Sequence, residues 1–154
     1  MNPPSRRALL TTLPVALASS SAILAAPASA TSVASAGGGV EVVVGWKPLT
    51  LRAGVTPFPG DAPQARTVRV AGTSFLQLRG GASVSFTTDA VLGTLPTGIA
   101  VTKLTRGLCS RNNFNGLIVC RVEADTKGQL TVLGGTTASK ITWVALDSFS
   151  SVLA

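Results

Sequence analysis

The chain lacks histidine and tyrosine, and it is poor in charge and in aromatic residues: of its 154 residues, 12% are charged and 5% are aromatic. Without histidine it can form no Ser-His or Cys-His nucleophile pair, and it offers no imidazole ligand to a metal ion. The few aromatic residues and the absence of a binding motif argue against recognition of nucleic acid. We therefore expect a protein that is not an enzyme and that has no cofactor.

Carboxylates are also scarce, with six Asp and Glu in the whole chain. Only Glu123 and Asp125 are close in sequence, at alternate positions near a predicted strand end, where they could share one face. Two carboxylates fall well short of the roughly six to eight oxygen ligands that calcium takes in proteins. A solvated turn is the simpler interpretation, and no metal site is predicted.

The first thirty residues have the pattern of an export signal. Arg6 and Arg7 form a basic start, a modestly apolar run continues to residue 26, and Ala28-Ser29-Ala30 is a small-x-small cleavage site, with cleavage after Ala28 as the near alternative. The arginine pair followed by x-Leu-Leu resembles a twin-arginine signal more than a general secretory one. Because Ser and Thr interrupt the run and no stop-transfer pattern follows, we expect no transmembrane segment after cleavage. The protein is predicted to be secreted, extracellular or associated with the cell wall.

Cleavage after Ala30 would leave 124 of the 154 residues, a length typical of one domain. Residues 31–39, TSVASAGGG, have the composition of a flexible leader, so the folded domain is expected over residues 40–154. Loss of Arg6 and Arg7 leaves 11 of the 13 Lys and Arg against six acidic residues, a net charge of +5. This excess favours acidic partners such as anionic cell-wall polymers, although the basic residues are scattered along the chain, as on an ordinary solvated surface.

Period-2 alternation of apolar residues recurs along the mature chain, and no helical period is found. In the first segment Val40, Val42, Val44 and Trp46 share one face, which makes Trp46 the predicted core aromatic. In the predicted strand over residues 67–71, Val70 is expected to face inward. The predicted strands cover residues 40–46, 49–53, 67–71, 74–79, 82–87, 99–104, 117–123, 129–133 and 140–146. About eight short strands with turn residues between them predict an all-β sandwich.

The only two cysteines lie in the stretch with the clearest turn signals, residues 95–123. A polar loop is predicted after Cys109, and Asn115-Gly116 is the pair favoured in a two-residue hairpin turn. Cys120 shares one face with Ile118 and Val122, opposite to the face of Arg121 and Glu123, and should face inward. An even cysteine count in an exported chain predicts a bridge between Cys109 and Cys120, and closing this loop would contribute roughly 3 kcal/mol of stability.

The order LPTGIAV, a short gap, one cysteine, a polar loop and IVCRV resembles the conserved-repeat immunoglobulin-like domain of bacterial surface proteins. Leu95, Pro96 and Gly98 match the turn of that domain, and Cys109 and Cys120 match its bridge. The resemblance implies an immunoglobulin-like β-sandwich with one disulfide, used in extracellular envelope architecture. It covers roughly a quarter of the mature chain, and the polar Asn-Gly strand ending found earlier in that domain is missing here.

Two functions follow from these patterns. The first is a secreted, non-enzymatic module that binds or decorates the bacterial cell envelope, with an anionic wall polymer or an envelope protein as its partner. The alternative is a secreted inhibitor or small-ligand carrier that uses the bridged loop, residues 110–116, as its contact surface. Phe114 distinguishes them, because a Phe114 exposed beside Arg111 would be a candidate apolar anchor, whereas an inward Phe114 would make the loop structural.

Overall fold

The structure, a computed structural model, describes residues 39–153. The predicted export signal, with Arg6, Arg7, Ala28 and Ala30, lies outside the described residues. The first strand begins at Val40, where the sequence predicted the domain to begin. Within residues 39–153 no helix has the length and apolar character needed to cross a membrane.

The regular secondary structure of the described residues is entirely β-strand, which confirms the predicted all-β class. Twelve strands are present in this part of the chain, more than the eight or so predicted, because several are only two or three residues long. In chain order they are β1 Val40–Pro48, β2 Thr50–Leu51, β3 Thr56–Pro57, β4 Gln64–Val70, β5 Thr73–Arg79, β6 Gly81–Phe86, β7 Ala90–Thr94, β8 Thr105–Phe114, β9 Leu117–Ala124, β10 Gln129–Leu133, β11 Ile141–Ala145 and β12 Ser150–Val152.

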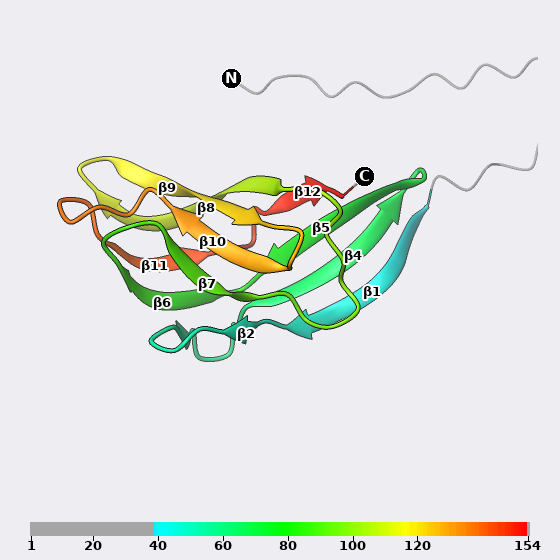
Figure 1. Ribbon diagram of the computed structural model, residues 1–154, viewed down its shortest axis with the longest axis horizontal. Coiled ribbons are helices and arrows are strands. Elements are labelled where there is room, and N and C mark those ends of the chain that lie inside the picture. Colours follow the sequence, from blue (N-terminus) through cyan, green and yellow to red (C-terminus); the bar gives the residue numbers. More distant parts are fainter. Residues whose placement is uncertain (1–38, 154) are drawn as a thin grey trace, which may run out of the picture. The chain divides into compact units, whose positions relative to one another are not determined.

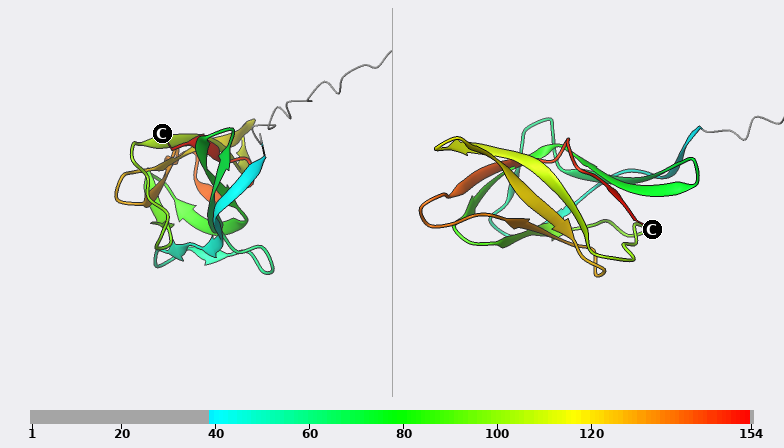
Figure 2. Two further views of the ribbon diagram at one scale, coloured as in Figure 1. Left: turned by 90° about the vertical axis from the view of Figure 1, so that its right-hand side faces the viewer. Right: turned by 90° about the horizontal axis from the view of Figure 1, so that it is seen from above.

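These strands form two sheets in which the neighbouring strands are antiparallel (Figure 1). The four-stranded sheet has the order β1-β4-β5-β12, and the eight-stranded sheet has the order β2-β7-β10-β9-β8-β11-β6-β3. Together the sheets nearly enclose a common interior (Figure 2). Side chains of both sheets fill this interior, among them Leu76 and Leu78 of β5 and Val122 of β9. Leu76 and Leu78 face inward as the alternation predicted.

Phe149, in the connection between β11 and β12, is the largest fully buried side chain in the described residues. It lies against Gly107 of β8, where a β-carbon would come within 2.6 Å of its ring carbon Cδ2. Glycine at this position lets the strand approach the ring closely. The core aromatic of this domain is therefore Phe149, and the prediction that Trp46 takes this place is wrong.

β8 differs most from the sequence prediction. Residues 99–104 form no strand, although Ile99 and Val101 are buried. The strand runs instead from Thr105 through Cys109 to Phe114, so the predicted polar loop 110–116 is the end of a β-hairpin. The turn of this hairpin is Asn115-Gly116, as predicted, with φ of 49° and 85°. The polar residues at 110–113 are typical of a loop, so the sequence predicted a loop where the structure has the end of a strand.

The predicted disulfide is absent from the structure: Cys109 and Cys120 are free thiols. They lie directly opposite each other on β8 and β9, both buried, and the Cys120 thiol donates to the backbone oxygen of Cys109 at 3.6 Å. The prediction treated the residues between them as a loop to be closed by a covalent bond. In the structure these residues belong to β8 and β9, and the backbone pairing of this hairpin holds the two cysteines opposite each other without a covalent bond.

Both thiols have raised pKa values. Burial is the main cause: it raises the pKa of Cys109 from 9.0 to about 12, with a smaller contribution from nearby Cys120, and it raises the pKa of Cys120 to about 11. Above pH 9 the unfolded chain loses thiol protons that the folded chain retains. The contribution of these thiols to stability is therefore complete below about pH 9 and falls as the pH rises toward 11 and 12.

We expect the free energy of unfolding to fall more steeply between pH 9 and pH 11 in the native chain than in a Cys109→Ala/Cys120→Ala variant. The extra slope can reach about 1.4 kcal/mol per pH unit for each thiol. Urea denaturation at a series of pH values measures it, and the variant removes the thiols while keeping every lysine that titrates in the same range. Equal slopes in the two proteins would show that burial does not keep the thiols protonated.

Candidate functional site

The outer face of the four-stranded sheet carries polar side chains that are far apart in sequence. Ala65, Leu76 and Leu78 belong to the core, so the alternate residues of β4 and β5 face outward. The register places Gln64 opposite Arg79 and Arg66 opposite Gln77. We call the resulting surface the arginine–tryptophan face and define it by Trp46, Gln64, Arg66, Gln77, Arg79 and Ser150.

Trp46 is held on this face by two arginines. The guanidinium carbons of Arg66 and Arg79 lie 4.5 and 4.4 Å from the centroid of its ring, which is the geometry of a cation–π contact. β1 has register shifts between Val42 and Val44 and between Val44 and Lys47. These irregularities break the simple alternation, so that Val44 packs against the core whereas Trp46 faces the outside.

Glutamine side chains hold the two guanidinium groups in place. Arg66 Nε donates to Gln77 Oε1 at 2.8 Å, and Arg79 Nε and Nη2 donate to Gln64 Oε1 at 3.0 and 2.6 Å. An amide oxygen orients a guanidinium group but does not neutralise its charge.

The acidic partners of the other arginines lie elsewhere. The ion pairs formed within residues 39–153 join Glu41 to Arg69 and Glu123 to Arg106 and Arg121. Neither Arg66 nor Arg79 takes part in them. The arginine–tryptophan face thus presents two guanidinium groups that form no ion pair with a carboxylate of the described residues.

A hollow of about 220 Å³ opens on this face, between Trp46 and the outward side chains of β4 and β5. Asp147 also lines it, and its carboxylate accepts a hydrogen bond from the backbone N–H of Gly80 at 3.1 Å. The free guanidinium N–H groups and the hydroxyl of Ser150 are suited to the oxygens of a phosphate or carboxylate. The hollow has the chemistry of a binding site and contains no nucleophile paired with a base.

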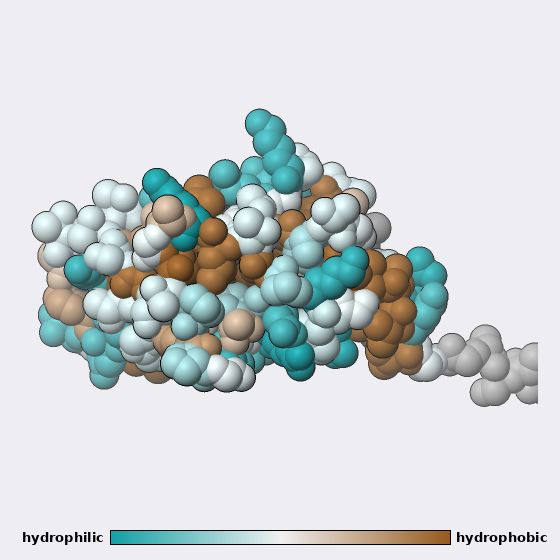
Figure 3. Space-filling model, turned by 90° about the horizontal axis from the view of Figure 1, so that it is seen from below, coloured by the Kyte–Doolittle hydropathy of each residue, from teal (hydrophilic) through white to brown (hydrophobic). Residues whose placement is uncertain are grey.

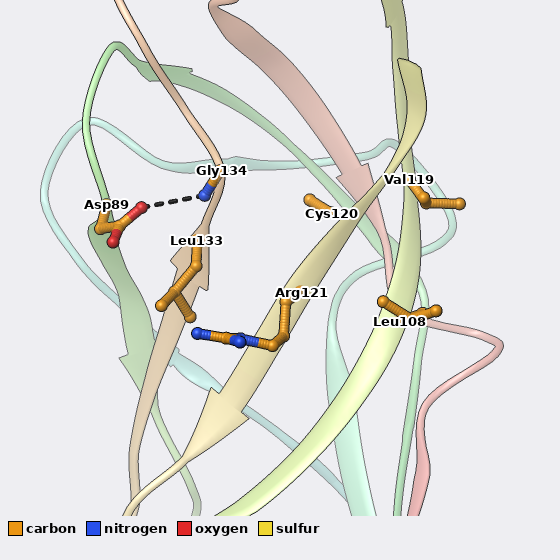
Figure 4. A pocket seen from close by; sticks show the side chains of 7 residues that line it. All are labelled: Asp89, Leu108, Val119, Cys120, Arg121, Leu133 and Gly134. Atoms are coloured by element: carbon orange, nitrogen blue, oxygen red, sulfur yellow. Dashed lines mark hydrogen bonds between the residues drawn. The ribbon is translucent and has the colours of Figure 1, made fainter. Parts of the chain in front are cut away.

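A larger, mostly apolar depression of about 460 Å³ lies on the outer side of β8, β9 and β10 (Figure 4). Leu108, Val119 and Leu133 line it, with Arg121 extending toward Leu133. Its charged groups already have partners, since Arg121 Nε lies 3.1 Å from Glu123 Oε1 and Asp89 accepts the N–H of Gly134 at 2.9 Å. The arginine–tryptophan face is therefore the better candidate for binding a charged ligand.

Arg111, the charged neighbour of Phe114 in the predicted binding loop, is only 2% exposed. Its guanidinium donates to the backbone oxygens of Asn112, Gly134, Ser139 and Lys140 at 2.9 to 3.3 Å. Arg111 is therefore not available as a contact residue of the predicted loop, because its side chain faces inward from β8 and donates to backbone carbonyls. It ties β8 to the connection between β10 and β11.

Phe114 lies half-buried at the end of β8, opposite Leu117 of β9. Its position is thus intermediate between the inward and exposed arrangements that would distinguish the two functions, and its role as an apolar anchor stays a prediction. Leu117 and Ile118 next to it are 54% and 57% exposed.

The two neighbouring carboxylates have separate structural roles. Glu123 pairs with arginines, and Asp125 accepts the backbone N–H groups of Lys127 and Gln129 at 2.9 and 2.8 Å within the predicted turn. In the part of the chain that the structure describes, no group of three or more acidic or cysteine side chains is placed to hold a metal ion.

No family model and no curated protein sequence matches the chain. Its fold is similar to that of the receptor-binding protein gp15 of Listeria phage PSA, with a TM-score of 0.54 and 14% sequence identity over 74% of this chain and 67% of the phage protein. The receptor-binding head domain of the lactococcal phage bIL170 also matches, with a TM-score of 0.46 and 14% identity over 72% of this chain and 99% of that domain. The resemblance to the immunoglobulin-like domain of bacterial surface proteins stays a prediction.

Proposed function

We propose that the protein is a secreted, non-enzymatic module that binds anionic polymers of the bacterial cell envelope through the arginine–tryptophan face. The observation that carries this proposal is the pair of arginines around Trp46, since Arg66 and Arg79 have no carboxylate partner within residues 39–153. Phosphate or carboxylate groups of a polymer would complete the hydrogen bonding of these guanidinium groups.

Two further observations support a binding role. The mature chain carries a net charge of +5, which attracts anionic polymers over several ångströms at moderate salt. The fold is compatible with recognition at a cell surface, since the Listeria phage protein of similar fold is a receptor-binding protein. Export, read from the basic start at Arg6 and Arg7 and the cleavage site at Ala30, would bring the module to the envelope.

Sedimentation with purified cell walls tests the proposal, using the chain from residue 31, which contains both sheets and the core described above. We expect the protein to pellet at low salt and to be released as the salt concentration rises, because exposed charges are screened within about 8 Å at physiological ionic strength. An Arg66→Gln/Arg79→Gln variant should bind at least about tenfold more weakly, since each charge-assisted hydrogen bond to the ligand contributes on the order of 1 kcal/mol or more.

The matched control is Arg52→Gln/Lys127→Gln, which removes the same charge from exposed positions outside the face. It should lower binding only slightly. If the native protein stays in the supernatant at low salt, envelope binding is wrong. If both double variants weaken binding equally, net charge alone retains the protein and the arginine–tryptophan face is not its site.

A further inference from the structure

The same outer face is apolar toward the tip of the β4–β5 hairpin. The register aligns Val42 with Val68, Val68 with Phe75, and Phe75 with Val152 across all four strands. At the end of the face Val40 lies opposite Val70. We call the exposed part the valine tip and define it by Val40, Val42, Val43 and Val70, which are 65%, 56%, 44% and 37% exposed. Figure 3 shows apolar surface gathered at the end of the domain where β1 begins.

The valine tip projects beyond the core. The turn between β4 and β5 is Ala71-Gly72, with φ of 47° and 83°, and a β-carbon on Gly72 would have no neighbouring atom within 4 Å. Both residues are small, so the tip carries apolar surface on a narrow, freely accessible hairpin end. Clustered exposed apolar side chains of this kind mark sites of contact with another molecule or with a membrane.

Strand addition by a second copy does not fit this surface well. β1 is the edge strand, but its two register shifts fall between Val42 and Lys47 and interrupt the row of backbone groups that a new strand would need. Pro48, at the end of β1, has no N–H to donate. The valine side chains remain available, whereas the backbone edge is protected.

Positive charge lies on the same face, further from the β4–β5 turn than the valine tip. Arg66 precedes Val68 by two residues on β4, about 7 Å along the strand, and Arg79 lies diagonally across from Arg66 on β5, opposite Gln64. Glu41, the acidic residue of β1, is already paired with Arg69 at 3.0 Å. An apolar tip that shares a face with arginines free of ion pairs is a combination that binds anionic lipid surfaces, where apolar burial and attraction to head groups add.

We propose that the valine tip docks on an anionic lipid surface, with its valines at the boundary between head groups and acyl chains and with Arg66 and Arg79 on the lipid phosphates. The inference shares these arginines with the proposed function and rests on it to that extent. It differs in one respect that can be measured: a wall polymer needs the arginines alone, whereas a lipid surface needs the valines as well.

The test is cosedimentation of the chain from residue 31 with vesicles of equal parts phosphatidylglycerol and phosphatidylcholine, and with vesicles of phosphatidylcholine alone. We expect binding to the anionic vesicles and little to the neutral ones. Val42→Ser/Val70→Ser should weaken binding at least about tenfold, because it removes apolar area that leaves water on docking. Arg66→Gln/Arg79→Gln should weaken it at least about tenfold as well.

The matched control is Leu117→Ser/Ile118→Ser, which removes two exposed apolar side chains from the β8–β9 hairpin and should bind vesicles like the native protein. Circular dichroism of each variant verifies folding. The proposal is overturned if the native protein does not bind anionic vesicles at low salt, or if Val42→Ser/Val70→Ser binds them as tightly as the native protein does. If the protein still binds lipid-free walls in either case, the proposed function stands. If it binds vesicles but not walls, the lipid surface is its partner and the wall polymer is not.

Discussion

Replacement of Arg111 by methionine is expected to lower the free energy of unfolding by about 2 kcal/mol. Methionine fills a similar volume but donates no hydrogen bond. The change would remove the hydrogen bonds that the oxygens of Gly134, Ser139 and Lys140 accept from the guanidinium, although Ser139 still accepts from the N–H of Thr136 and Lys140 from Asn112 Nδ2. Loss of hydrogen bonds from a charged donor costs about 1.5 to 3 kcal/mol, the remaining donors limit the total, and urea denaturation at neutral pH measures it.

Arg106→Met is the control for this prediction. Arg106 is exposed and its Nε lies 2.9 Å from Glu123 Oε1, so its loss should change stability by less than about 1 kcal/mol. Arg111→Lys should fall between the two, because one ammonium group cannot serve carbonyls spread over residues 134–140 in the way a guanidinium group does. An Arg111→Met protein as stable as the Arg106→Met protein would show that the buried guanidinium is dispensable.

Insertion of a methyl group at Gly107 is the second change with a large expected effect. In Gly107→Ala the new carbon would lie 2.6 Å from Cδ2 of Phe149, a side chain that is 1% exposed and cannot move into solvent. Overpacking of this kind costs about 1 to 3 kcal/mol. We expect a loss near 2 kcal/mol, measured by urea denaturation.

A double-mutant cycle with Phe149→Leu shows whether the clash is the cause. The smaller side chain makes room, so Gly107→Ala should cost at least about 1 kcal/mol less in the Phe149→Leu protein than in the native one. Gly45→Ala is the control, because a β-carbon there meets no atom within 4 Å and its stability should change little. Strict additivity of the two substitutions would contradict the packing derived from Gly107 and Phe149.

Period-2 alternation predicted the inner strands well, because a strand packed on one side must bury every second residue. Leu76 and Leu78 are both in the core, and the turn pair Asn115-Gly116 lies where its backbone preference places it. The same alternation failed for β1, where the register shifts around Val44 depend on the partner strand. Val70 failed for another reason: it is 37% exposed because its strand extends past the end of the core.

The candidate site could have been predicted only from the hairpin register. The turn Ala71-Gly72 aligns Gln64 with Arg79 and Arg66 with Gln77, but this requires knowing that β4 begins at Gln64 and not at residue 67. The burial of Arg111 was not predicted, because its acceptors are main-chain carbonyls up to 29 residues further along the chain. Every residue has a backbone carbonyl, so the sequence does not indicate which ones accept from Arg111. The alternation of apolar residues assigned side chains to strands, but the residues that these side chains contact depend on how the strands pair.

The position of β12 sets the order in which the chain can acquire its structure. This strand forms one edge of the four-stranded sheet by pairing with β5, and Leu153 directly after it is buried and donates its N–H to the oxygen of Ser74 at 2.9 Å. The residue of β12 that pairs with Leu76 of β5 is Ser151, which is synthesised 75 residues after Leu76. A nascent chain cannot complete this sheet until residue 153 has left the ribosome. Folding of the whole domain is thus expected only after its last strand has emerged, which leaves a period in which the incomplete domain exposes apolar surface to chaperones.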